Sequence, residues 1–381
     1  MNLLDCYLFK SVLGTCLAAV ALLTFVLTFG NVVRDLMSYV LAGQLPALTV
    51  VHLVWLWVPA MAIYAVPMGL LTGVLLTLGR LSADSEITAM RTGGISLARV
   101  ARPVLIVGAL GATLALYINF ESMPHARVSY EREFADALRT NPLSFIVPKT
   151  FIRSFKGNVI YVGEKNGASL RDIWIWELDS QQRVRRLIRA ESGRIDYDEA
   201  SNSLVPTLVN AKAEERSAEN PEDFSKSPKA PSVDKIEEVR LSLDRYFGKN
   251  AEKMKDDWLT YDGLQAKRAN LAAETVPPEK TKEHARAQIK LALIFHEKWN
   301  LALAVFSFAL IGVPLGIKVS RRETSANLGV ALALVIGFYL LTAAVKSLDR
   351  HPEYHPEILL WVPNALFLGL GVWLFSRIDR Q

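Results

Sequence analysis

Cysteine is scarce in this chain. Only two of its 381 residues, Cys6 and Cys16, are cysteines, and both lie near the N-terminal end. The polar middle region has none, so its fold must be stable without disulfides, and two cysteines alone make no metal-ligand pattern. We interpret the pair as small apolar side chains in a hydrophobic segment.

Motifs of nucleotide and hydrolase chemistry are also lacking. The glycines and lysine of GVPLGIKVS have the wrong spacing for a phosphate-binding loop, and neither G-x-S-x-G nor H-E-x-x-H occurs. The nearest metal-like cluster is HPEYHPE, His351 to Glu357, where a proline after each histidine disfavours the helix that would pair the histidines. We therefore expect a chain that is not an enzyme and has no metal site and no nucleotide cofactor.

Charged residues are missing from six stretches, each long enough to cross a bilayer as a helix of about 20 residues. Six such runs exceed what the core of a soluble protein needs, so we predict an α-helical polytopic membrane protein with a 3+3 arrangement of spans. Proton-driven transporters usually carry ionisable residues deep in their spans; these runs have none, which favours an external energy source. The runs are Ser11–Val33, a part of 36–79 beginning near His52, Pro103–Phe120, Trp299–Ile317, Thr324–Val345 and Ile358–Ser376.

Lysine and arginine predict the orientation of the spans, because cytoplasmic loops carry an excess of both. Ten lie in or beside the short loops on one side and three on the other. Both termini are therefore expected in the cytoplasm and the middle region outside, and the net charge of +5 needs no nucleic-acid partner. The ten are Lys10, Arg80, Arg91, Arg99, Arg102, Lys318, Arg321, Arg322, Arg377 and Arg380, and the three are Arg34, Lys346 and Arg350.

The middle region separates the sequence into three parts: spans at 1–120, an inserted domain at 121–298 and spans at 299–381. Alternating apolar residues from about Ser144 to Ala213, divided by turn residues, predict short antiparallel strands of an all-β sandwich or jellyroll. Helices are expected at both ends of this domain. The segment at about 217–234 is rich in Pro, Ser and charged residues, and we predict a disordered or loop insert there, followed by one more strand.

The polar stretch LGRLSADSEITAMRTGGIS, Leu78 to Ser96, lies between the second and third spans. We predict a short helix at about 82–93, since capping residues and charges suit both of its ends. Such a helix between two spans is typical of a coupling helix that fits a groove on a separate ATPase, although a solvated loop helix remains an alternative. Its expected landmarks are Ser82 or Asp84 as N-cap, Glu86 in the first turn, Arg91 in the last turn and Gly93 or Gly94 at the end.

This stretch resembles the LptF/LptG (YjgP/YjgQ) permeases, the membrane subunits of the lipopolysaccharide-export ABC transporter. The segment HEKWNLALAVFSFALIGVPLGI is similar to the fourth span of that family, and the order of spans and inserted jellyroll is similar along the whole chain. The Ser-Glu-Ile-Thr sequence is more similar to the LptF members than to the LptG members. The matching residues of the first stretch are Gly79, Ser85, Glu86, Ile87, Met90, Gly94 and Ile95.

The resemblance implies a multi-pass inner-membrane permease subunit that extracts lipopolysaccharide and passes it through a periplasmic jellyroll toward the outer membrane. It implies four partners: a cytoplasmic ABC ATPase dimer that binds the ATP, a second LptF/LptG-type permease, a single-span LptC-like jellyroll protein, and lipopolysaccharide. The residues implied at the ATPase contact are Ser85, Glu86, Ile87, Met90 and Arg91.

The resemblance also implies a lipid A contact at Arg34, at the outer end of the first span, because a guanidinium suits phosphate. A helix-end residue that reaches the headgroups is the alternative. The chain departs from many family members one turn earlier, where Asn31 replaces a second basic residue.

Acyl chains need apolar walls, and for every candidate residue ordinary core packing is the alternative. The candidates in the spans are Phe25, Phe29, Leu56, Met61 and Met68, and those in the inserted domain are Ile160, Val162, Ile173 and Ile175.

A second class of function stays open on the sequence. A membrane scaffold or sensor with a periplasmic binding domain and no transport activity would have the same arrangement of spans and inserted domain. A lipid-modifying enzyme would need a catalytic group of residues near a membrane face, and the sequence shows none.

Overall fold

The computed structural model describes residues 3–41, 47–140, 146–153, 155, 157–179, 181–198, 203–215, 232–236, 241–242, 255–274, 281–318, 324–350 and 354–379. The chain forms two compact units. One comprises Met1–Arg34, Val54–Tyr130 and Lys255–Gln381, and the other comprises Asp35–Leu53 and Glu131–Met254. Residues 255–298, which the sequence assigned to the inserted domain, thus lie in the same unit as the spans.

Within the described residues, six helical segments are long and apolar enough to cross a membrane, as the sequence predicts. α2 begins at Ala47, one turn before the expected His52, and continues through Pro59 and Pro67. The third segment runs through α4, a π-helical turn η1 and α5, and the sixth joins the short α10 to α11. The elements are α1 (Leu3–Leu41), α2 (Ala47–Ala83), α4 (Leu97–Tyr117), η1 (Ile118–Ser122), α5 (Met123–Thr140), α8 (Thr281–Lys318), α9 (Thr324–Lys346), η5 (Ser347–Arg350), α10 (Pro356–Leu359) and α11 (Val362–Asp379).

Two helices form the centre of the helical unit. α2 and α8 are mostly buried, whereas the apolar parts of α1, α9 and α11 are largely exposed, which suits contact with lipid or another chain. On one side of α8 the Phe308 ring meets Phe338 of α9 and Phe367 of α11 at centroid distances of 5.2 and 5.5 Å. The packing core of the spans is thus built around α8.

Glycines let α1 and α2 approach backbone to backbone. Gly69 and Gly73 lie four residues apart on α2, the spacing at which membrane helices pack closely. A Cβ at Gly73 would lie 2.5 Å from Cys16 Cα, and one at Gly69 would lie 2.7 Å from Val20 Cα. No side chain larger than hydrogen fits at either position without moving α1.

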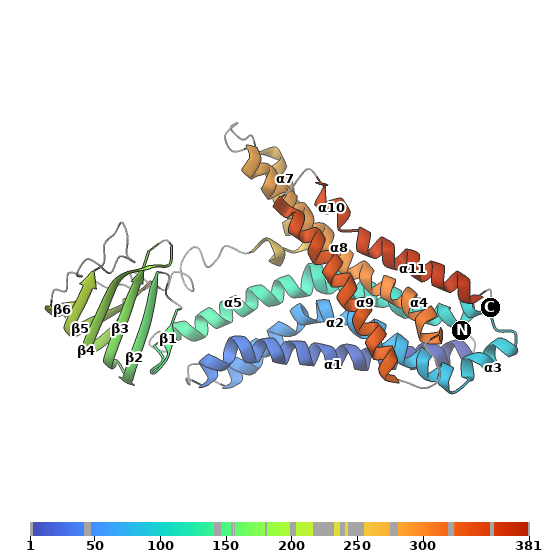
Figure 1. Ribbon diagram of the computed structural model, residues 1–381, viewed down its shortest axis with the longest axis horizontal. Helices are drawn as coiled ribbons and strands as arrows, with labels where there is room; N and C mark the ends of the chain where they lie inside the picture. Colours follow the sequence, from blue (N-terminus) through green and yellow to red (C-terminus); the bar gives the residue numbers. More distant parts are fainter. Residues whose placement is uncertain are drawn as a thin grey trace, which may run out of the picture. The chain divides into compact units, whose positions relative to one another are not determined.

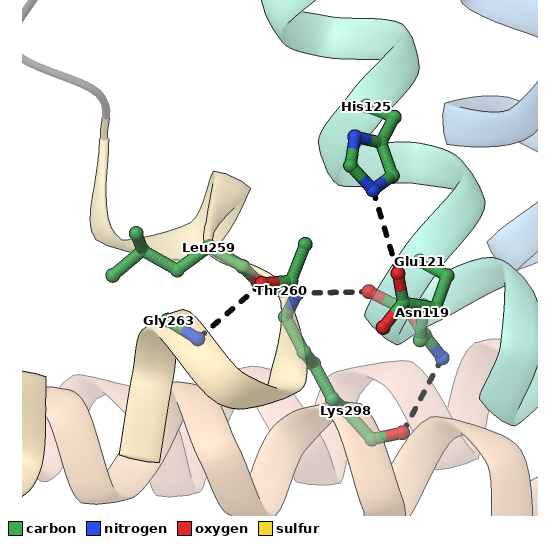
Figure 2. Close-up of polar contacts among 7 residues, drawn as sticks. All are labelled: Asn119, Glu121, His125, Leu259, Thr260, Gly263 and Lys298. Carbon is green, nitrogen blue, oxygen red and sulfur yellow. Dashed lines mark hydrogen bonds and ion pairs between the residues drawn. The ribbon is translucent and has the colours of Figure 1, made fainter. Parts of the chain in front are cut away.

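A buried lysine joins three elements at the end of the spans where α4 becomes η1 (Figure 2). Lys298 of α8 is 4% exposed, and its Nζ donates to the Asn119 carbonyl at 2.8 Å and the Leu259 carbonyl at 2.9 Å. Asn119 lies in η1, and Leu259 lies between η3 (Asp256–Trp258) and α7 (Tyr261–Ala273). Thr260 caps α7 by accepting from the Gly263 amide at 3.3 Å.

The inserted domain is an antiparallel sheet with strand order β1-β2-β3-β4-β5-β6, to which β7 adds by pairing with β5 (Figure 1). The all-β prediction is therefore confirmed. Gly167, with φ of +59°, makes the tight turn between β2 and β3. The strands are β1 (Phe151–Ile152), β2 (Asn158–Asn166), β3 (Ser169–Leu178), β4 (Val184–Asp198), β5 (Ser203–Glu215), β6 (Ser232–Ile236) and β7 (Leu241–Ser242).

The predicted disordered insert at 217–234 falls mostly outside the described residues. For its last three positions, 232–234, the prediction is wrong, because β6 begins at Ser232, which pairs with Lys212 of β5. Backbone pairing with a strand some twenty positions earlier outweighs the polar composition on which the prediction rested.

Candidate functional site

The helix between the second and third spans is α3 (Glu86–Thr92), seven residues long. It ends at Gly93 as predicted, and Gly94 follows with φ of +84°. The predicted start is wrong. α2 continues to Ala83, and Ser85 precedes α3 in a left-handed conformation with no side-chain capping bond. Ser82 belongs to α2, where its hydroxyl donates to the Ile317 carbonyl of α8 at 3.1 Å.

α3 has one buried face and one exposed face. Ile87 is 3% exposed, and Met90 packs against the same core cluster. Because this cluster contains side chains of α1, α2, α4 and α8, α3 cannot shift without displacing the spans. Members of the cluster include Leu8 and Val12 of α1, Leu81 of α2, Val104 of α4 and Val313 of α8. The exposed face presents Ser85, Thr88, Ala89, Arg91 and Thr92.

Glu86 lies at the boundary between the two faces. Its carboxylate is partly exposed and accepts a hydrogen bond from the Tyr7 hydroxyl of α1 at 3.2 Å. An exposed hydrogen bond of this kind is worth roughly 1 kcal/mol or less. A partner cation could therefore replace Tyr7 at little cost.

A second contact ties the same end of α1 to α2. Arg80 donates to the Ser11 hydroxyl at 3.0 Å, one turn beyond Tyr7. α1 is thus attached near its beginning to both α3 and the last turns of α2. Figure 1 places α3 at the end of the helical unit where both chain termini lie.

An apolar groove of about 540 Å³ lies between α1, α2 and α9. The hydroxyl groups of its two threonines are hydrogen-bonded within their own helices: Thr15 donates to the Ser11 carbonyl at 2.9 Å and Thr72 to the Met68 carbonyl at 2.8 Å. The groove therefore offers a nearly continuous hydrocarbon surface of a kind that suits an acyl chain. Its lining consists of Thr15, Ala18, Ala19, Leu22, Leu23, Met68, Thr72, Leu76, Ala331, Leu332 and Val335.

The predicted acyl-contact residues of the spans divide into three groups. Met68 lines the groove, as described above. Phe25 and Phe29 lie on the exposed side of α1, 65% and 59% exposed, with their rings stacked at 6.0 Å. Leu56 is half-buried, and Met61 is buried beside Asn31, whose amide donates to the Met61 sulfur at 3.3 Å.

The four predicted residues of the inserted domain share one face of the sheet. Ile160 pairs with Ile175, and Val162 with Ile173, across β2 and β3. All four are at most 2% exposed. They form part of the packed interior of the domain, which leaves their role in an acyl path a prediction.

Arg34, the predicted phosphate contact, lies in α1, and its side chain is outside the described part of the structure. No three His, Cys, Asp or Glu side chains of the described residues come close enough together to hold a metal ion.

Sequence reasoning missed the long-range contacts of three polar residues, one of which, Ser82, it assigned to the N-cap of the short helix. Tyr7, Ser82 and Lys298 each bond to a partner far away in the chain, 79, 235 and 179 positions distant for Glu86, Ile317 and Asn119. Only Lys298 gave a signal, as a cation directly before an apolar run.

Comparison with known proteins agrees with this arrangement. A family profile described as "Lipopolysaccharide export system permease LptF/LptG" matches residues 6–377. Curated relatives named "Lipopolysaccharide export system permease protein LptF" from Escherichia coli (strain K12), Escherichia coli O157:H7 and Shigella flexneri are each 24% identical over 370 residues, covering 97% of this chain and 93% of the relative. Because the profile covers nearly the whole sequence, this chain belongs to the LptF/LptG family of lipopolysaccharide export system permeases.

Proposed function

We propose that this inner-membrane, multi-pass chain is the non-catalytic permease subunit of an ABC transporter that extracts lipopolysaccharide from the inner membrane. In this proposal a separate ATPase dimer binds the ATP and drives the process from the cytoplasm. The sheet domain lies in the periplasm, receives the lipid and passes it toward the outer membrane.

The two faces of α3 carry the proposal. A docking helix must present a surface to the ATPase and transmit force to the spans. The exposed side chains around Arg91 meet the first need, and Ile87 and Met90 meet the second because they are fixed in a core shared by four helices. A solvated loop helix would need no such anchor.

The contacts of α1 suggest how movement of α3 reaches the lipid. α1 is packed against α3 in the shared core cluster through Leu8 and Val12, and the groove wall begins at Thr15. These positions lie within about two turns of helix, roughly 10 Å. A displacement of α3 therefore moves the α1 wall directly against α2 and α9, which changes the width of the groove.

The proposed topology follows from the distribution of lysine and arginine, with α3 and both termini in the cytoplasm. The largely exposed apolar surfaces of α1 and α9 suit a second LptF/LptG-type permease, which would close the groove. A single-span LptC-like protein would receive the lipid from the sheet domain.

Co-purification from native membranes tests the proposal. The wild-type chain should bring down an ATPase and a second permease with ATP hydrolysis in the eluate, and Glu86→Ala should reduce the recovered ATPase by about tenfold, as expected for losing a charge-assisted hydrogen bond. Tyr7→Phe is the matched control. It removes the same intramolecular bond and leaves the carboxylate in place, so the ATPase should be retained.

Recovery of a wild-type chain that is alone and inactive would contradict the proposal and favour the scaffold or sensor function. Equal losses in Glu86→Ala and Tyr7→Phe would show that Glu86 acts by holding α1 rather than by touching the ATPase.

A further inference from the structure

A second cavity lies at the opposite end of the helical unit from α3. It is a cleft of about 480 Å³ between α7, α8 and α10, within the size range of small-molecule sites. Ala269, Ala272, Ile289 and Ala292 give it apolar walls. Two charged side chains of opposite sign, Arg268 and Glu357, also line it.

Arg268 is held in place but has no carboxylate partner among the described residues. Its guanidinium lies over the Phe295 ring of α8, 4.8 Å from the centroid. The nearby carboxylate of Asp256 is already bound by Lys267 and by Lys290. The guanidinium therefore has donors to offer to a bound anion.

Glu357 lines the same cleft, and one oxygen of its carboxylate is unsatisfied. Its Oε1 contacts His355 Nδ1 at 3.2 Å, while Oε2 is buried and has no hydrogen-bond partner in the described part of the chain. Leaving such an atom unbonded is costly, so the oxygen suits a bound N–H donor. No ion pair joins Arg268 to Glu357 in the described structure, and the cleft thus has a separate positive and negative pole.

The position of the cleft relative to the spans indicates the source of its ligand. Trp361 follows Glu357 by one helical turn, and its indole N–H donates to His296 of α8 at 3.3 Å. Tryptophans gather at the level of lipid headgroups. Ile358 is 65% exposed, and exposed Val362 and Leu366 continue along α11, giving an apolar path from the cleft toward the hydrocarbon region.

We propose that this cleft binds the phosphoethanolamine headgroup of a membrane phospholipid. The phosphate binds Arg268, the ammonium donates to the Glu357 carboxylate, and the acyl chains lie along α11. Phosphatidylcholine lacks the N–H donor, and phosphatidylglycerol lacks the ammonium. The proposal goes beyond lipopolysaccharide export and requires only that the helices span a membrane.

Native mass spectrometry of the full-length chain tests it, after equilibration in detergent with equal amounts of phosphatidylethanolamine, phosphatidylcholine and phosphatidylglycerol. We expect about tenfold more bound phosphatidylethanolamine than either other lipid, as one charge-assisted hydrogen bond supports. Equal retention of the three lipids by the wild-type chain would overturn the proposal without any mutant.

Variants then locate the site. Glu357→Gln should reduce the preference for phosphatidylethanolamine about tenfold, whereas Arg268→Gln should weaken binding of all three lipids about tenfold, because each of them carries the phosphate. Arg286→Gln and Glu274→Gln change exposed charges on α8 and after α7 that do not line the cleft, and should keep both the binding and the preference. Loss of the preference in these controls as well would overturn the assignment.

A competition experiment then distinguishes a membrane lipid from a soluble ligand with the same headgroup. Glycerophosphoethanolamine carries the same headgroup without acyl chains, and it should compete only weakly with the lipid. If it displaces the lipid at equal concentration, the site takes a free phosphoethanolamine ester and the proposed lipid source is wrong.

Discussion

The close contact of α1 with α2 makes a quantitative prediction for Gly73→Ala. The added Cβ would lie 2.5 Å from Cys16 Cα and 2.7 Å from the Cys16 backbone nitrogen. Carbon atoms pack at about 3.5–4.0 Å, so the α1 backbone must move by about 1 Å. No rotamer change relieves a clash with backbone, and overpacking of this kind costs about 1–3 kcal/mol.

The assay is thermal unfolding of the detergent-solubilised chain, followed by loss of the monodisperse peak. Gly14→Ala and Gly337→Ala are matched controls, because a Cβ at either position of α1 or α9 has nothing within 4 Å. The controls should unfold at or slightly above the wild-type temperature, since alanine favours helix. If Gly73→Ala is as stable as the controls, the backbone contact between α1 and α2 does not exist as described.

Two further predictions concern groups away from α3. Burial raises the pKa of Asp256, but hydrogen bonds from Lys267 and Lys290 outweigh it, and the pKa lies below its ordinary 3.8. The stability that this carboxylate contributes is therefore complete above pH 3.8 and is lost as the pH falls through the lower pKa of the folded state. Asp256→Asn should flatten the dependence of the unfolding temperature on pH between 5 and about 3. Asn364 accepts from Ser307 and donates to the Asn300 carbonyl, each at 2.8 Å. Asn364→Leu should lower the free energy of unfolding by about 1–2 kcal/mol in detergent, whereas Val372→Leu on the exposed side of α11 should not, and equal stability of the two would refute the role of this polar cluster.

The spans were predictable because their signal is local. A run of apolar residues as long as 299–317 has few alternatives to a membrane-spanning helix, and α8 covers the whole run. The strands β2 and β3 were equally visible, because alternation and the Gly167 turn are properties of neighbouring residues.

The start of α3 could not be predicted for the opposite reason. Ser82 is a good N-cap by type, but the Ile317 carbonyl takes its hydroxyl, and α2 therefore continues past it. The division of Glu86, Ile87 and Arg91 between buried and exposed faces likewise depends on α1 and α8, which sequence spacing alone does not place. The same holds for the groove, whose lining comes from three helices as far apart as Thr15 and Val335.

Contact between the exposed face of α3 and a separate ATPase can be measured by cysteine cross-linking in membranes. Cys6 and Cys16 are free and can be replaced to give a background without reactive thiols. Ala89→Cys and Thr92→Cys place a thiol on the exposed face, and Ile87→Cys places one in the core. We expect cross-links from positions 89 and 92 to an ATP-hydrolysing subunit and none from position 87. Absence of cross-links from the exposed positions, with the complex intact, would show that this face of α3 does not touch the ATPase.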